Sequence, residues 1–265
     1  MSSVNMREAF DRDGVVTLGQ VLDSSQIEDL RQRLDRWCMD ADGLKLSDVR
    51  DLADTLQGRT SQSVMQRVNI YQVDEIFDAL ARRNDFLSAV ESILGPDIRL
   101  FRDQCFYKPP LHGGEVYMHQ DNRYWHLDPP NAVVLYLALD DCTVETGCVY
   151  FVKGSHKRGR VEHVRACQGS SILLEAVVDK SLSTPLELPA GHASLHHCQI
   201  VHWSPPNRSV RPRRAHTIEY VAADVRCRGE SLHDAPLLRS TRFAEPAPRA
   251  SGPATEASIC VAHPK

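Results

Sequence analysis

Apolar residues near the start of the chain recur at the spacing of an amphipathic helix. The stripe consists of Ile27, Leu30, Leu34 and Trp37. Residues three or four apart lie on one face of a helix, so this pattern predicts a helix that packs on one side. Its start is indicated by candidate N-cap residues, Asp23, Ser24 and Ser25, with Gln26 and Glu28 placed for a capping box. A short β-like run at 14–18 precedes it. A second helical stretch covers about 73–94 and ends at Gly95.

After Pro96 the pattern changes to short apolar runs separated by turn residues. The runs cover 98–107, 132–139, 148–152, 171–174, 186–188, 193–195 and 216–221. Pairs such as Pro109-Pro110 and Gly113-Gly114 separate them. Many short strands at this spacing are typical of a β-sandwich or barrel, and a jelly roll with helices packed outside it fits best.

The same patterns suggest how the chain is organised. We expect one domain over residues 1–222, with a helical N-terminal part at 1–96 and a jelly-roll core at 97–222. Residues 223–265 lose the periodicity and read as a C-terminal extension. From residue 243 the extension is rich in Pro, Ala and Ser, which predicts flexibility at its end.

Composition narrows the classes of partner. The chain of 265 residues is 25% charged with a net charge of -4, so it has no global basic bias towards nucleic acid. No apolar run approaches the roughly 18 residues that a membrane span needs, and no secretory h-region is visible. The eight cysteines form no CxxC pair, which favours reduced thiols and a cytoplasmic protein. We expect a small-molecule partner, and the oligomeric state stays open.

The chemistry-bearing residues include Tyr117-Met118-His119-Gln120-Asp121 and the distant His202. In an extended strand, residues i and i+2 point to one face, so His119 and Asp121 can aim at one point. Two histidines and one carboxylate with open positions make the facial triad of non-haem Fe(II) oxygenases. A structural histidine bonded to a nearby carboxylate is the alternative for the His-x-Asp motif alone. Zinc-dependent hydrolysis is a further use of such a set.

Downstream of His202 the chain reads Trp203-Ser204-Pro205-Pro206-Asn207, and a basic pair follows at Arg213-Arg214. Here the sequence resembles the phytanoyl-CoA dioxygenase family of Fe(II)/2-oxoglutarate oxygenases. The segments Glu145–Lys157, with its Gly-Ser-His, and Phe10–Val16 are similar to two other family segments, so the resemblance covers about 10–220. The resemblance implies a double-stranded β-helix (jelly roll, cupin-like) core. Trp203 departs from the pattern, since relatives often have a small residue there.

The resemblance also implies roles for individual residues. His119, Asp121 and His202 would bind Fe(II), and Arg213 and Ser204 would bind the far carboxylate of the co-substrate 2-oxoglutarate. Gln104 and Tyr136 match positions that contact the co-substrate, or they pack in the barrel. Arg211 and Arg214 are rivals to Arg213, but in a strand only one of Arg213 and Arg214 can enter the barrel. His196 and His197 are rivals to His202, which the spacing to Arg213 favours.

These residues predict a dioxygenase that uses Fe(II), 2-oxoglutarate and O2 to hydroxylate an unactivated C–H of a small metabolite or natural product. Succinate and CO2 would be released. Asp121 favours hydroxylation over chlorination, because halogenating relatives lack the carboxylate. Desaturation, epoxidation, cyclisation and a non-catalytic metal-binding jelly roll stay as alternatives. The loop after the metal motif, at Arg123, Tyr124, Trp125 and His126, is the candidate substrate contact, and residues 45–66, 122–130 and 161–179 are expected to frame the pocket.

Overall fold

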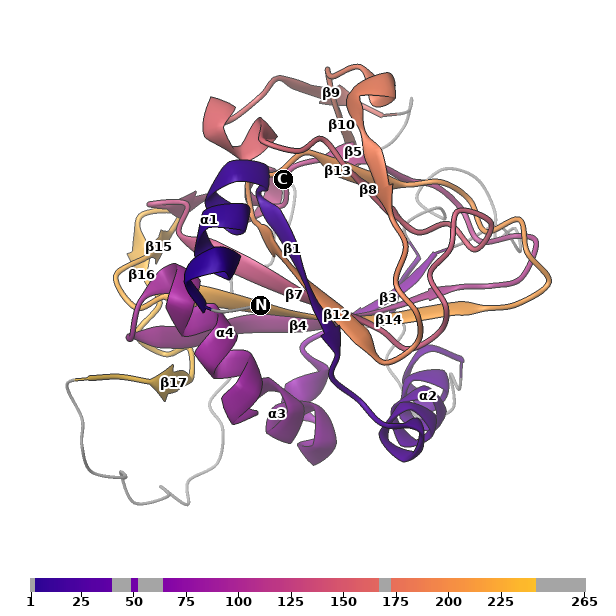
Figure 1. Ribbon diagram of the computed structural model, residues 1–265, viewed down its shortest axis with the longest axis horizontal. Helices are drawn as coiled ribbons and strands as arrows, with labels where there is room; N and C mark the ends of the chain where they lie inside the picture. The colour runs from indigo at the N-terminus through magenta and orange to yellow at the C-terminus, as the bar shows by residue number, and fades with distance from the viewer. Residues whose placement is uncertain (1–2, 40–48, 52–63, 167–172, 242–265) are drawn as a thin grey trace.

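The computed structural model describes residues 3–39, 49–51, 64–166 and 173–241 (Figure 1). Within these residues the largest element is an eight-stranded sheet. Its order is β1 (Val15–Gln20), β12 (His192–His197), β7 (Ala132–Ala138), β14 (Arg213–Ala222), β4 (Ile98–Lys108), β3 (Met65–Val68) and β2 (Val49–Asp51), with β17 (Leu237–Arg239) also paired to β4. Strands distant in the sequence are therefore neighbours in this larger sheet.

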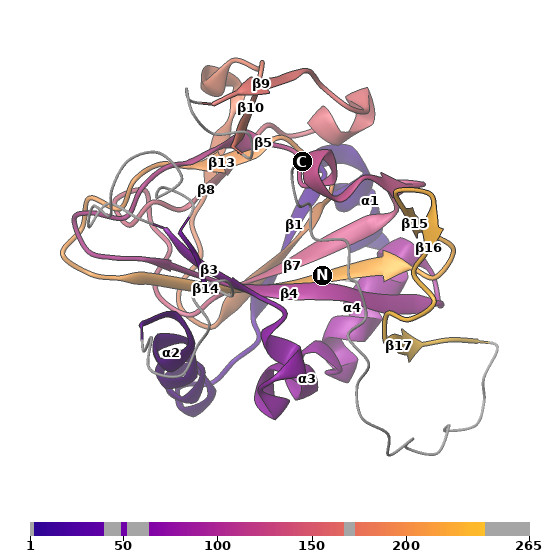
Figure 2. The same cartoon turned by 180° about the vertical axis from the view of Figure 1, so that it is seen from behind.

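A smaller sheet lies over the larger one (Figures 1 and 2). Among the described residues it has the order β11 (Thr184–Leu186), β8 (Val149–Phe151), β13 (His202–Ser204) and β5 (Val116–His119). Two short additions are β9 (His163–Arg165) with β10 (Leu174–Ala176), and β6 (Leu127–Asp128) with β15 (Arg226–Cys227) and β16 (Glu230–Ser231). The protein is mainly β, and its two facing sheets form the jelly-roll core that the sequence predicts.

Four helices cover the outer face of the larger sheet in the described part of the chain. They are α1 (Ser3–Asp13), α2 (Ser24–Met39), α3 (Glu75–Ala81) and α4 (Asn84–Leu94). Short turns of 3-10 helix occur at Ile70–Gln72, Ser155–Arg158 and Lys180–Leu182, and a one-turn helix, α5, spans Asn122–Trp125. Figure 1 shows α3 and α4 beneath β4 and β14, with α2 at one end of the sheet. The main apolar core lies between these helices and the sheet.

The outer face of the larger sheet packs on the helices, and its inner face carries several polar side chains. On β4, Cys105 and Tyr107 belong to the core shared with the helices, whereas Gln104 and Lys108 do not. Because successive side chains of a strand point to opposite faces, Gln104 and Lys108 face the interior of the barrel. Lys108 confirms this direction by bonding to Ser204 on the smaller sheet. The inner face therefore carries the polar groups from which a site can be built.

The start of α2 follows the capping box expected from the sequence. Gln26 N–H donates to Asp23 Oδ1 at 2.9 Å, and Asp23 N–H donates to Gln26 Oε1 at 3.0 Å. These two bonds satisfy backbone donors that a helix start leaves without partners. The predicted apolar stripe is buried at Leu30 and Leu34, which are 3% and 0% exposed.

The single helix expected at 73–94 is two helices. The first ends at Ala81, and Arg83 has an extended ψ of 131° that separates it from α4. Arg83 NH2 donates to the Val21 carbonyl, and its guanidinium lies 4.3 Å from the Phe86 ring centroid. The contacts of Arg83 therefore link the break to neighbouring elements, which helical spacing alone does not reveal. The predicted end at Gly95 is confirmed, where φ is 90°.

Most of the strands expected after Pro96 are present, with shifted ends. Within 97–222 the strands that were not predicted are β5, β6, β9 and β13, which have two to four residues each. Runs of this length are too short for a reliable alternation of apolar and polar residues. The extension also takes part in the fold, since β17 pairs with β4 and β15 pairs with β6. The division into domains stays a prediction, and the residues from 242 onwards lie outside the described part of the chain.

Five cysteines in the described chain are buried thiols, namely Cys105, Cys142, Cys148, Cys198 and Cys227. None of the helices in the described part is both long enough and apolar enough to span a bilayer.

Candidate metal centre

Three side chains converge between the two sheets where β5 and β13 pair. His119 ends β5 and lies opposite His202 in the antiparallel register, with ring centroids 4.3 Å apart. Asp121 Oδ1 lies 3.4 Å from His119 Nε2 and 3.7 Å from His202 Nε2. One ligand atom from each of the three residues lies within 4.8 Å of the others. The geometry therefore allows all three to bind one metal ion.

Asp121 reaches this point by a different route from the one expected. The residue is not on a strand, because its φ of -57° and ψ of -43° are helical and it begins the turn of α5. The expectation that His119 and Asp121 share one face of an extended strand is therefore wrong, although their side chains do meet. The helical turn brings the carboxylate back towards His119. The turn, and not the alternation of side chains along a strand, therefore brings the two side chains together.

The two imidazoles are oriented by backbone carbonyls. His119 Nδ1 lies 2.7 Å from the Tyr117 carbonyl oxygen, and His202 Nδ1 lies 3.0 Å from that of Ile200. A carbonyl only accepts, so each Nδ1 carries the proton and each Nε2 offers its lone pair to the shared point. Such outer contacts usually orient the histidines of metal sites.

The protonation states of His202 and Asp121 suit the binding of a metal cation. Burial lowers the pKa of His202 to about 3, so this imidazole is neutral near pH 7. Burial alone would raise the pKa of Asp121, but the neighbouring His202 and the contacts from His119 and His196 hold it well below its usual range. The cluster therefore offers the neutral imidazole of His202 and the anionic carboxylate of Asp121, with His119 Nε2 as the second nitrogen donor.

A buried guanidinium lies on the same interior face of the barrel. Arg213, at the start of β14, is 2% exposed, and its NH1 donates to the Tyr136 hydroxyl at 2.7 Å. Its Nε makes no hydrogen bond, and no acid in the described chain forms an ion pair with it. An uncompensated buried charge is costly, so this arrangement suits an anionic ligand.

Lys108 adds a second buried basic side chain that sequence reasoning missed. It lies opposite Arg213 in the β4–β14 register and is fully buried. Its Nζ donates to Ser204 Oγ at 2.7 Å, to the Ser204 carbonyl at 3.2 Å and to the Pro205 carbonyl at 2.6 Å. Burial and the nearby Arg213 lower the pKa of Lys108 well below its ordinary value. Lys108 therefore holds the chain after His202 and leaves the Ser204 proton free to donate elsewhere.

The loop between β13 and β14 is held by Asn207, which is fully buried. Its Nδ2 donates to the carbonyls of Lys108, Pro109 and Arg211, and its Oδ1 accepts from Ser209. Gly113 passes close by, where a Cβ would lie 2.7 Å from Lys108 Cβ and 3.0 Å from Asn207 Cβ. These contacts explain why an amide and a small residue occupy these positions.

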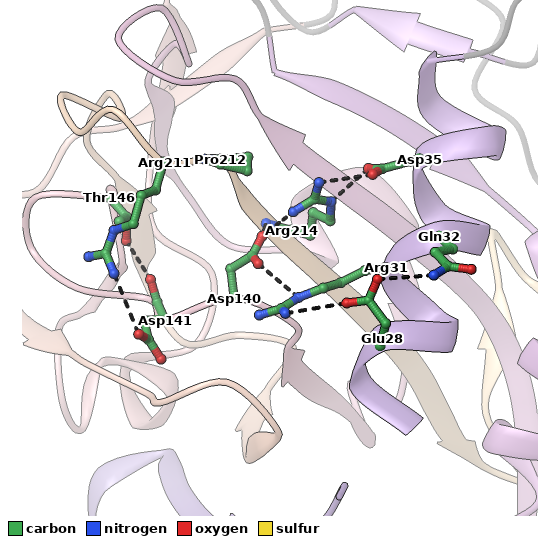
Figure 3. Close-up of a pocket in the computed structure, with 10 residues that line it drawn as sticks. All are labelled: Glu28, Arg31, Gln32, Asp35, Asp140, Asp141, Thr146, Arg211, Pro212 and Arg214. Carbon is green, nitrogen blue, oxygen red and sulfur yellow. Dashed lines mark hydrogen bonds and ion pairs between the residues drawn. The ribbon is translucent and has the colours of Figure 1, made fainter. Parts of the chain in front are cut away.

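The two rival arginines lie elsewhere. Arg214 points to the opposite face of β14, where it binds Asp35 and Asp140 in a charged surface cleft against α2 (Figure 3). Arg211 is exposed and lies 3.6 Å from Asp141 in the same cleft. Arg213 is therefore the member of the basic cluster that faces the barrel interior.

Comparison with known families decides what kind of protein carries this arrangement. The sequence profile of the family Phytanoyl-CoA dioxygenase (PhyH) matches residues 10–215. The chain belongs to this family. The match includes all three residues of the cluster and ends two residues after Arg213.

Curated PhyH relatives are similar over part of their length. A phytanoyl-CoA dioxygenase of Arabidopsis thaliana is 27% identical over 157 residues, which is 58% of this chain and 56% of the relative. Phytanoyl-CoA dioxygenase domain-containing protein 1 of Bos taurus is 31% identical over 161 residues, which is 58% of this chain and 55% of the relative. A probable alpha-ketoglutarate-dependent hypophosphite dioxygenase of Stutzerimonas stutzeri is 28% identical over 174 residues, or 63% and 60% of the two chains.

Solved structures show the same architecture. The apo form of the non-heme monooxygenase ThoJ is 26% identical with a TM-score of 0.73, covering 89% of this chain and 84% of ThoJ. The epimerase SnoN, in complex with Fe3+, alpha ketoglutarate and nogalamycin RO, is 19% identical with a TM-score of 0.74, covering 90% of this chain and 99% of SnoN. The likeness to SnoN is one of fold alone.

The residues of this PhyH protein fit iron and a dicarboxylate on structural grounds. The nitrogen and oxygen donors of the cluster suit iron, and Asp121 Oδ2 is a buried acceptor without a hydrogen bond. The buried Arg213, with no acid paired to it among the described residues, suits a carboxylate. Ser204 and Tyr136 lie beside Lys108 and Arg213 respectively. Their contact with a co-substrate stays a prediction.

Gln104 belongs to a buried polar cluster further along the inner face. Its Nε2 donates to Glu219 Oε1 at 2.8 Å, and its side-chain oxygen accepts from Gln66. Thr217 Oγ1 also donates to Glu219 Oε1, at 2.7 Å. Burial raises the pKa of Glu219 to about 7. Sequence reasoning missed Glu219, although its alternation with the outward Ile218 and Tyr220 could have placed it on the inner face.

The predicted substrate residues lie in and just after α5, with different surroundings. The Tyr124 ring meets that of His119 edge-on at 5.7 Å, so Tyr124 lies beside the cluster. Arg123 and His126 are partly exposed. Trp125 is 3% exposed and packs on Phe101, with centroids 5.5 Å apart. A substrate contact stays a prediction for each residue, and the burial of Trp125 favours a packing role instead.

Trp203, the departure from the family pattern, points away from the cluster. Its Nε1 donates to Ser183 Oγ at 2.9 Å, and its ring lies 5.0 Å from that of Tyr150. His202 and Ser204, on either side in β13, are buried. Because Trp203 faces the outer side of the smaller sheet, its bulk does not obstruct the site.

Proposed function

We propose that this protein is an Fe(II)- and 2-oxoglutarate-dependent dioxygenase that hydroxylates an unactivated C–H of a small metabolite or natural product. The observation that carries the proposal is the pairing of the cluster His119, Asp121 and His202 with Arg213 inside one barrel. Membership of the PhyH family supports it. An N,N,O set alone would also suit zinc, but a buried guanidinium has no evident role in zinc-dependent hydrolysis.

Each residue has a definite task in this proposal. His119, Asp121 and His202 hold the iron and leave its remaining positions open. Iron, 2-oxoglutarate and O2 together supply the oxidising power, with release of succinate and CO2. Arg213 presents two parallel N–H groups to the far carboxylate of 2-oxoglutarate, and Tyr136 keeps the guanidinium in place. Ser204, held by Lys108, donates its proton to the same carboxylate.

Hydroxylation is the favoured outcome because Asp121 would give the metal a carboxylate ligand, which halogenating relatives lack. Desaturation, epoxidation and cyclisation use the same oxidising power. The names of similar proteins include an epimerase and a monooxygenase, so the fold supports several outcomes. Mass spectrometry of the product separates the gain of one oxygen atom, as in hydroxylation or epoxidation, from the loss of two hydrogens, as in desaturation or cyclisation. NMR of the product then distinguishes the members of each pair.

The proposal is tested first without a substrate. Anaerobic addition of Fe(II) and 2-oxoglutarate to the apoprotein is expected to produce a visible charge-transfer band. The band should be lost in His202→Ala and Asp121→Ala and retained in His197→Asn, a matched change on the other face of the barrel. No band in the wild-type protein, with no affinity for 2-oxoglutarate, would support a non-catalytic jelly-roll binder.

The substrate is identified by screening metabolites and natural products for stimulated succinate release. We expect the true substrate to raise succinate formation above the uncoupled rate and to yield an oxidised product. The loop residues Arg123, Tyr124 and His126 are proposed to contact it. Substitution of a contacting residue should raise the substrate KM while leaving the charge-transfer band intact.

A further inference from the structure

Two adjacent histidines on β12 point to opposite faces of the larger sheet. His197 faces outwards, where its ring lies 6.1 Å from Phe10 and 5.2 Å from His156. His196 faces the barrel interior, is 3% exposed, and lies 5.1 Å from the His202 ring and 5.2 Å from Phe151. Strand alternation thus places one of the two histidines beside the metal cluster.

The two oxygens of Asp121 face different groups. Oδ1 lies 3.4 Å from His119 Nε2 and 3.7 Å from His202 Nε2, so this oxygen belongs to the cluster. Oδ2 lies 3.5 Å from His196 Nε2. Oδ2 is buried and accepts no hydrogen bond within the described chain. His196 is therefore the group positioned to donate a hydrogen bond to it.

His196 is not a fourth member of the metal cluster. The residues whose ligand atoms converge are His119, Asp121 and His202. Nδ1 of His196 is buried without a hydrogen bond in the described structure, so no carbonyl fixes its proton there. His119 and His202 differ in this respect, because backbone carbonyls hold their Nδ1 protons. Without a partner at Nδ1, the imidazole can carry its proton on Nε2. This N–H can then donate a hydrogen bond to Asp121 Oδ2.

We propose that His196 is a positioning residue whose Nε2–H binds Asp121 Oδ2 and reserves Oδ1 for the metal. A carboxylate that offers both oxygens to iron would fill a position that the co-substrate or O2 needs. His196 keeps the carboxylate monodentate by engaging the second oxygen. This role rests on the proposed iron site and adds to it a residue outside the three ligands.

The test uses substitutions that keep or remove the donor at Nε2. His196→Gln places an amide N–H near the Nε2 position, whereas His196→Asn is too short and His196→Leu has no donor. His197→Asn is the matched control, because Asn can replace the His197 Nδ1 acceptor that receives the Gln199 N–H at 3.0 Å. Anaerobic titration with Co(II) measures metal affinity from the d–d bands, and Fe(II) with 2-oxoglutarate gives the energy of the charge-transfer band.

We expect His196→Leu and His196→Asn to weaken Co(II) binding on the order of tenfold to a hundredfold, the usual effect of losing an outer-sphere partner. The charge-transfer band should shift in both, while His196→Gln and His197→Asn should behave like the wild type. If His196→Leu does not fold, the comparison of His196→Asn with His196→Gln still tests the positioning role.

Two results would overturn the positioning role. One is unchanged affinity and band energy in His196→Asn, which would make His196 a packing residue. The other is loss of metal binding in His196→Gln as complete as in His202→Ala, which would make His196 a ligand. Absence of the band in the wild-type protein would instead refute the proposed iron site, so the two failures are distinguishable.

Discussion

At the scale of single residues, the informative groups are charges buried in the barrel. Arg213 and Lys108 are 2% and 0% exposed and lie opposite one another in the β4–β14 register. Lys108 satisfies its three N–H groups within the protein, at Ser204 and Pro205. Arg213 keeps an Nε without a hydrogen bond. The two basic side chains therefore differ in role, with Lys108 shaping the site and Arg213 available to a ligand.

The first prediction separates charge from geometry at Arg213. Arg213→Lys keeps the positive charge but loses the planar fork, so the affinity for 2-oxoglutarate should fall about tenfold to a hundredfold. Anaerobic titration with 2-oxoglutarate in the presence of Fe(II) measures it. Arg214→Lys is the control and should leave this affinity unchanged, because Arg214 points to the surface cleft. Equal affinity in Arg213→Lys and the wild type would contradict the assignment.

The second prediction concerns Glu219, whose pKa burial raises from 4.5 to about 7. Between these pH values the folded protein keeps a proton that the unfolded chain has lost. Stability therefore falls as pH rises through this window, by about 3 kcal/mol at about 1.4 kcal/mol per pKa unit. Glu219→Gln cannot titrate, so its free energy of unfolding relative to the wild type should rise between pH 4.5 and pH 8.

Denaturant unfolding of apoprotein across this range measures the Glu219 effect. Glu8→Gln, at an exposed position, is the control for replacing a glutamate by glutamine on the surface. A constant difference for Glu219→Gln would show that Glu219 is ionised throughout.

At the scale of elements, the site depends on how short segments begin and end. β5 ends at His119, and the helical turn that starts at Asp121 brings the carboxylate back to the cluster. β13 lasts three residues and alternates His202 and Ser204 inwards with Trp203 outwards. Neither segment has enough residues to form alone, so β5 depends on pairing with β13, and β13 depends on pairing with both β5 and β8.

The third prediction tests the local signal that starts α2. Asp23→Ala removes the acceptor for the Gln26 N–H and should lower the free energy of unfolding by about 1 kcal/mol. Asp23→Asn retains an acceptor oxygen and should lose much less. Chemical denaturation compares the three proteins. An Asn variant as unstable as the Ala variant would mean that the carboxylate acts by its charge instead of by capping.

At the scale of the whole molecule, the two sheets together create the site. The larger sheet supplies Arg213, Lys108 and His196, the smaller sheet supplies His119 and His202, and Asp121 begins the turn after β5. Ligands that bind across both sheets should therefore stabilise the complete fold.

The fourth prediction measures this coupling. Mn(II) with 2-oxoglutarate, used in place of Fe(II) to avoid oxidation, should raise the Tm by several degrees. A ligand at about 100 times its Kd adds about 2.7 kcal/mol to the free energy of unfolding. His202→Ala should show no such rise. A shift in that variant equal to the wild type would mean that the ligands bind outside the cluster.

Much of the fold was predictable because its signals are local. The capping box at Asp23, the end of α4 at Gly95 and the long apolar strands all follow from neighbours in the chain. The break at Arg83 was not, since it involves the carbonyl of Val21, which is 62 residues earlier in the chain. For the site, the spacing from His202 to Arg213 singled out the residue that proves to face inwards.

By itself, the sequence determined the mainly β class, the family, and the set His119, Asp121, His202 and Arg213, since residue types at set spacings carry that information. Only the tertiary structure decided how Lys108 holds Ser204, that Glu219 is buried beside Gln104, and that His196 meets the second oxygen of Asp121. These contacts join strands far apart in the chain. The register of these strands comes from the packing of the two sheets and the helices. No local pattern of residues specifies that packing.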